Sequence, residues 1–319
     1  MLQAAALHYN FNDPAMRPFH LKATYQLYDE SGQPAEKGAY EYWWASPAAN
    51  RSSWTRDGAT HTDWHTADGK HAFLGTGDAL KFLEFKLQSA LFSPLPADPD
   101  LDPSTSRLDR QMMEIGKVRV PCIEVIPKMP YHGQLQTVPL GLFPTYCFDT
   151  TVPALRVSYA WGTLTTAYDK IGTVQNRYLA RQIEMLEGKR KLLTAEVETV
   201  TGLSPNDPAL TPASDASIPP VKGEVDLSAS VAQGMLLKKV IPVYPQDAKE
   251  AHVDGKVVLE AIIGMDGGIH DLRVISAPWP SLAASALWSV SQWKYKPYLL
   301  NGKAVDVKTT INVIYSLGY

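Results

Sequence analysis

The chain has 319 residues, of which 45% are hydrophobic and 20% are charged. That composition supports a sizeable buried core, and at about 150 residues per domain the length suits roughly two domains. The 30 basic and 33 acidic residues leave a formal net charge of −3. This balance argues against nucleic acid or an anionic membrane as the main partner, because both attract a basic excess.

The first 200 residues predict a domain of antiparallel strands. Polar and apolar residues alternate in short runs, and Asp57-Gly58 and Asp68-Gly69 are turn signals between them. The stretch 177–186 fits either a helix or a strand, and we favour a strand because an alternating run follows it. We expect the other strands at 19–28, 38–44, 51–56, 59–66, 71–74, 117–126, 142–149, 154–160, 164–169 and 193–197.

One helix interrupts these strands. Residues 77–92 place Leu80, Leu83, Leu87 and Leu91 at helical spacing, and Asp78 is able to cap the first turn. We therefore expect an antiparallel sheet or half-barrel with one helix packed on it.

A change of composition marks the domain boundary. Residues 201–233 are rich in Pro, Ser and Ala and have no apolar periodicity, which is typical of a semi-rigid linker. We expect a β-rich domain at 1–200, a linker at 201–233 and a small domain at 234–319.

The last part of the chain predicts an α+β unit in the order αββαβ. Pro245 suits the first position of a short helix at 246–251, and Pro280 opens a second, longer helix. Strands are expected at 256–263, 269–276 and 305–315, with an extended stretch at 295–300.

The chain carries no recognisable catalytic motif. It has no G-x-S-x-G, Walker A, G-x-G-x-x-G or H-E-x-x-H pattern, so we predict neither an enzyme nor a cofactor. His61, Asp63 and His65 share one face of a predicted strand, and such a set is able to bind a divalent metal. We favour the simpler interpretation, the polar face of a half-exposed strand.

Aromatic residues gather in the first predicted strands. They suit an apolar cavity for a lipid or acyl chain, and they equally suit an ordinary core between the sheet and the helix. The residues concerned are Tyr40, Tyr42, Trp44, Trp54 and Trp64.

The C-terminal domain resembles the C-terminal domain of the TonB family over about residues 237–319. Each shared motif also has a physical role: Gly255 ends a helix, and Trp293 anchors a helix to the sheet. The motifs that carry the resemblance are Pro242-Val243-Tyr244-Pro245, Val253-Asp254-Gly255-Lys256-Val257, Asp266-Gly267-Gly268-Ile269, Trp293-Lys294-Tyr295-Lys296-Pro297 and Asn301-Gly302-Lys303.

The resemblance implies a periplasmic or cell-envelope protein. Its partner would be an outer-membrane TonB-dependent transporter, or another envelope protein, whose extended segment binds by β-strand addition. The chain lacks the N-terminal membrane helix of a standard energy transducer, so we expect any leader or anchor to be absent from it. The contact residues carried over are Ile241, Pro242, Val243, Tyr244, Pro245, Val307, Thr309, Ile311 and Val313.

Two further expectations remain, of which the first depends on this compartment and the second on architecture. An oxidising periplasm favours a disulfide between Cys122 and Cys147, on neighbouring predicted strands, over two buried thiols. The N-terminal domain resembles, by architecture alone, the half-barrel of LolA- and LolB-type lipoprotein carriers. That resemblance implies an alternative function, a lipid or lipoprotein carrier with a TonB-like adaptor domain.

Overall fold

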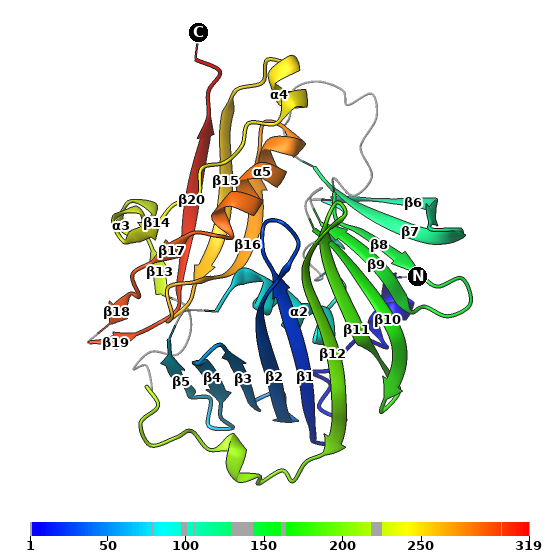
Figure 1. Cartoon of the computed structure of the whole chain (residues 1–319), viewed down its shortest axis with the longest axis vertical. Helices are drawn as coiled ribbons and strands as arrows, with labels where there is room; N and C mark the ends of the chain where they lie inside the picture. The colour runs from blue at the N-terminus through cyan, green and yellow to red at the C-terminus, as the bar shows by residue number, and fades with distance from the viewer. Residues whose placement is uncertain are drawn as a thin grey trace.

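The computed structural model describes residues 2–77, 80–96, 101–104, 106–128, 143–160, 164–217, 225–300 and 302–318. Its main feature is an open antiparallel sheet in the order β5-β4-β3-β2-β1-β12-β11-β10-β9-β8-β7-β6 (Figure 1). The strands are β1 Phe19–Tyr28, β2 Pro34–Ser46, β3 Ala49–Arg56, β4 Ala59–His65, β5 His71–Thr76, β6 Ser106–Ile115, β7 Val118–Pro127, β8 Thr145–Phe148, β9 Leu155–Ala160, β10 Leu164–Val174, β11 Arg177–Glu187 and β12 Arg190–Gly202.

The sheet joins strands that are far apart in the sequence. β1 pairs with β2 on one side and with β12 on the other, so the first and last strands of the domain are neighbours. Burial alternates along β1, as expected for a strand with one face on the core. The stretch 177–186 is a strand, as predicted.

A helix on one face of the sheet fills the N-terminal core. Helix α2 (Phe82–Phe92) buries Leu87 and Leu91 against this sheet, together with side chains from the segment of α1 (Leu2–Ala6). The helix begins five residues later than predicted. Its first turn is capped from within, because Glu84 accepts a hydrogen bond from the Lys81 N–H at 2.6 Å; the predicted cap, Asp78, lies outside the described residues.

The C-terminal domain has a four-stranded sheet in the order β13-β20-β15-β16. Helix α5 (Pro280–Val290) packs on it, and Trp293 donates its indole N–H to the Val240 carbonyl at 2.8 Å. Its other elements are β13 Val225–Leu227, α3 Ala229–Gly234, β14 Leu236–Lys238, α4 Gln246–Glu250, β15 Gly255–Ile263, β16 Ile269–Ser276, β17 Lys294–Tyr295, β18 Leu299–Leu300, β19 Lys303–Ala304 and β20 Val307–Tyr315.

The segment predicted as a linker is partly ordered structure. β12 extends to Gly202, and the 3-10 helix η2 (Pro208–Leu210) lies on the sheet, where Trp64 donates its indole N–H to the Ala209 carbonyl at 3.0 Å. β13 and α3 also fall inside the predicted linker and belong to the C-terminal domain. Local composition did not reveal them because both are short and are held by contacts with distant residues.

The two domains pack against each other. α2 contacts both β11 of the large sheet and β16 of the small one, and it lies between them (Figure 1). Phe82 of α2 packs on the C-terminal core, whereas Trp288 of α5 packs on the N-terminal core. Cys122 and Cys147 are directly opposite on β7 and β8 and form the predicted disulfide.

No helix within the described residues has the length and apolar character that a membrane span requires.

Candidate functional site

One edge of the C-terminal sheet is largely open. β15 pairs with β20 along its whole length, from Gly255 opposite Tyr315 to Ile263 opposite Val307. On the other side β13 pairs only with Val307–Thr309. Within the described part of the chain, the backbone from Thr310 to Tyr315 therefore has no strand neighbour on that side, and such an edge is able to accept another strand.

The predicted contact residues of β20 present backbone rather than side chains. Val307, Thr309, Ile311 and Val313 are buried and point into the core. The alternate positions, Thr310, Asn312 and Ile314, are exposed. A chain that adds to this edge would consequently gain main-chain hydrogen bonds from β20 and side-chain contacts from its exposed face.

The predicted stretch Ile241–Pro245 lies at the end of the same edge. Tyr244 packs its ring edge-on against Tyr315 of β20, with the centroids 5.3 Å apart, and its hydroxyl donates to the Val253 carbonyl at 2.6 Å. Ser285 donates to the Val243 carbonyl at 2.5 Å. Ile241 and Val243 are 80% and 78% exposed, so two apolar side chains are open to solvent in a segment that α5 and the end of β20 hold in place.

The other edge of the sheet faces the N-terminal domain. His270 of β16 stacks on Phe85 of α2 at 3.9 Å and bonds to Asp266 at 2.9 Å. Burial alone would lower the pKa of His270, but the hydrogen bond and the charge of Asp266 outweigh it and raise that pKa. The same pairing outweighs burial at Asp266 and lowers the pKa of its carboxyl. An ion pair is therefore held inside the domain interface.

The histidines considered as metal ligands lie near this interface. His61 is buried, whereas Asp63 bonds to His71 of β5 at 3.1 Å and His65 stacks on the same His71. Among the described residues no group of three or more His, Cys, Asp or Glu side chains is arranged to hold a metal ion. Burial would lower the pKa of His71, but the hydrogen bond and charge of Asp63, with a smaller contribution from Asp306 of the C-terminal domain, outweigh it and raise that pKa.

The aromatic residues considered as a ligand cavity lie in three different places. Tyr40, Trp44 and Trp54 are buried in the N-terminal core, where the rings of Tyr40 and Trp54 stack at 3.9 Å. Trp64 bonds to η2 and is not part of that core cluster. Tyr42 alone of the five lines a hollow of about 530 Å³ at the interface, with Phe85, Phe92 and His270 on its wall.

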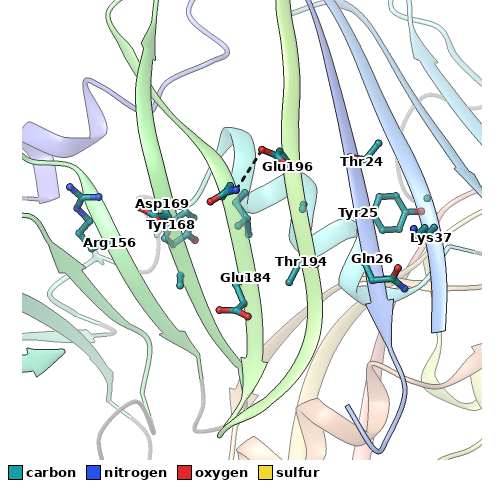
Figure 2. A pocket seen from close by; sticks show the side chains of 15 residues that line it. Thr24, Tyr25, Gln26, Lys37, Arg156, Tyr168, Asp169, Glu184, Thr194 and Glu196 are labelled. Carbon is teal, nitrogen blue, oxygen red and sulfur yellow. Dashed lines mark hydrogen bonds between the residues drawn. The ribbon is translucent and has the colours of Figure 1, made fainter. Parts of the chain in front are cut away.

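A second hollow, of about 840 Å³, runs across the large sheet. Figure 2 shows its wall, with Thr24 and Gln26 of β1, Thr194 and Glu196 of β12 and Glu184 of β11. Three of its charged side chains are paired within the domain, in the ion pairs Arg156–Asp149, Lys191–Glu184 and Lys170–Glu196. Lys37 and Asp169 also line the hollow, so its wall carries charges of both signs.

A buried charge network beneath α2 was not foreseen from the sequence. Glu84 is fully buried and accepts hydrogen bonds from the Tyr25 hydroxyl and from Nε of Arg56, the latter at 3.0 Å. Arg56 also pairs with Glu36 at 2.5 Å. The sequence held one hint, because Glu84 stands among the apolar residues of the helix. No pattern near it in the sequence pointed to Arg56 as its partner.

Comparison with known families identifies the C-terminal domain. The family model described as Gram-negative bacterial TonB protein C-terminal matches residues 241–317, which confirms the resemblance drawn from the motifs. A search of the curated proteins finds no match.

Three solved structures are similar to parts of this chain. The solution structure of the Pseudomonas aeruginosa TonB C-terminal domain is 26% identical and covers 26% of this chain and 86% of its own, with a TM-score of 0.24. A LolA superfamily protein from Nitrosomonas europaea is 9% identical, covers 66% of this chain and 96% of its own, and has a TM-score of 0.38. A DUF1329 family protein from Desulfovibrio piger is 13% identical, covers 62% of this chain and 92% of its own, and has a TM-score of 0.33. At these TM-scores the structural neighbours do not bear on function.

Proposed function

We propose that this chain is a cell-envelope protein of the periplasm whose C-terminal domain binds an extended segment of an outer-membrane transporter, or of another envelope protein. The guest segment adds as a strand beside Thr310–Tyr315 of β20. The observation that carries the proposal is the backbone edge of β20, which has no strand partner beyond Thr309 among the described residues. The family match of residues 241–317 supports the choice of partner.

The periplasmic location has its own support in the bonded pair Cys122–Cys147, because disulfides persist in oxidising compartments. The opposite edge strand, β16, is a poorer docking site, since α2 of the N-terminal domain packs against it.

The test is a titration of the ¹⁵N-labelled full chain with a peptide that carries the TonB box of an outer-membrane transporter. We expect amide shifts in β20 and in the stretch Ile241–Pro245. Val243→Asp should weaken binding, whereas Leu299→Asp, an exposed apolar position on β18, should not. Shifts that avoid β20, or no shifts at all, would contradict the proposal.

A second proposal, a carrier for an amphipathic lipid-like ligand, is supported by the hollow of about 530 Å³, whose wall combines the aromatic residues Tyr42, Phe85 and Phe92 with polar ones such as Lys86, Gln88 and Asp271. Native mass spectrometry of protein purified without detergent tests it. A co-purified acyl compound that is lost in Phe92→Asp would support the carrier function, and mass corresponding to protein alone would oppose it.

A further inference from the structure

The docking edge of β20 is partly occupied by the chain itself. β13 runs parallel to β20, with Val225 opposite Val307, Asp226 opposite Lys308 and Leu227 opposite Thr309. Thr309 donates its hydroxyl to the Leu227 carbonyl at 2.9 Å, and Leu227 packs on the C-terminal core. β13 therefore uses the same backbone groups that an added strand would use.

This contact is short and ends abruptly. Three residues are fewer than the roughly five or six of an average strand, so the pairing supplies few hydrogen bonds. After Leu227 the strand pairing ends and the chain forms α3, which still contacts β20 and whose Ala232 is buried in the C-terminal core. The helix tethers β13 close to β20, so the effective concentration of β13 at this edge is high even though the pairing itself is weak.

We propose that β13 is a built-in competitor for the docking edge, which a guest strand displaces in order to pair along all of β20. This inference rests on the proposed function of that edge. It also describes the guest: an extended segment, parallel to β20, with an apolar residue in the place of Leu227. The residue before it would lie opposite Lys308, whose ammonium already pairs with Glu260 at 3.1 Å, so that position carries no demand for an acidic residue.

The competition has a measurable consequence. Weakening β13 without touching β20 should strengthen binding of the guest, because less of the edge must first be vacated. Fixing β13 to β20 should weaken binding, because only Thr310–Tyr315 then remains available.

The first test uses Leu227→Ala in the full chain. A fluorescent peptide that carries a TonB box should bind about three- to tenfold more tightly to this variant than to the wild type. The matched control is Val231→Ala, which shortens a half-exposed apolar side chain in α3 and should leave the affinity unchanged. Amide shifts of β20 without peptide report whether β13 has been loosened.

The second test locks the strand in place. Cysteines at Asp226→Cys and Lys308→Cys, which are opposite each other, are oxidised to a disulfide. The oxidised variant should bind the peptide at least about tenfold more weakly than after reduction. Wild-type protein with and without reductant controls for the native disulfide.

The outcomes separate the two ideas. Equal affinities of the wild type, Leu227→Ala and the oxidised lock would overturn the displacement of β13 while leaving strand addition intact. Failure of every one of these proteins to bind the peptide would refute the docking function itself.

Discussion

The backbone N–H of Leu80, just before α2, donates to Oδ2 of Asp266, in the turn between β15 and β16, at 3.1 Å. These residues are 186 positions apart and belong to different domains. Asp266 also accepts from the Gly268 N–H at 2.8 Å and bonds to His270. One buried carboxylate thus links the entry to α2, the β15–β16 turn and β16, and it joins the C-terminal domain to the N-terminal one.

We expect His270→Gln to weaken the domain interface in a pH-dependent way. The folded-state pKa of His270 is raised above its ordinary 6.5, so its contribution to stability is fully present below that pH and is lost as pH rises through the folded value. Asp266 has a lowered pKa, so its contribution is present above 3.8 and is lost as pH falls through the folded value.

Urea unfolding should therefore show a loss of about 1–3 kcal/mol in His270→Gln near pH 5.5 and a smaller loss near pH 9. His252→Asn is the control, because His252 is exposed and has a positive φ that Asn tolerates. Equal losses at both pH values would show that the His270 charge contributes nothing.

The buried network under α2 should be intolerant of losing its cation. Arg56→Met leaves the fully buried Glu84 carboxylate without its ion-pair partner, and we expect a cost of about 3–5 kcal/mol in the free energy of unfolding. Adding Glu84→Gln should restore part of this loss, because the remaining buried group is then neutral. A double variant no more stable than Arg56→Met would contradict an electrostatic origin.

The turn between β15 and β16 requires glycine at position 267. Gly267 has a φ of +76°, and a Cβ there would lie 2.0 Å from the Tyr295 carbonyl oxygen. Gly58 has a similar φ of +83° and open space around it, so replacing it with alanine measures the cost of the backbone conformation without a steric clash. In thermal unfolding, Gly58→Ala should lower the free energy of unfolding by about 1–2 kcal/mol, and Gly267→Ala should lower it by clearly more. Equal effects would mean that the contact with Tyr295 relaxes freely.

Reduction of the disulfide should destabilise the N-terminal domain. The bond closes a loop between residues separated by 25 positions, for which loop-closure entropy predicts about 3–4 kcal/mol. Urea unfolding of the wild-type chain with and without a reducing agent measures this difference. Unchanged midpoints would show that the cross-link restricts the unfolded chain very little.

Candidate site residues differed in how far the sequence could place them. The resemblance to the TonB family supplied both parts of the proposed docking site, the stretch around Tyr244 and the strand β20, but only the structure shows Tyr244 against Tyr315. The sequence could not show that β13 covers the first three residues of that edge, because a three-residue strand has no pattern of its own.

The polar face of β4 shows a similar limit. A period of two placed His61, Asp63 and His65 on one face, of which Asp63 is half-buried and His65 is exposed, whereas the ring of His61 lies against Phe73 of β5. His61 is accordingly buried rather than solvated.

The amino-acid sequence by itself determined most of the longer strands of both domains, the position of α5, the facing cysteines and the TonB-like C-terminal unit, because alternation, turn residues and ordered motifs are local signals; β6 and the short strands β13 and β14 were not among the predicted strands. Only the tertiary structure decided which strand edge stays open, which is covered by β13 or α2, and where Glu84 and Asp266 find their partners. Those outcomes depend on contacts between residues distant in sequence, whose free energies no local pattern records.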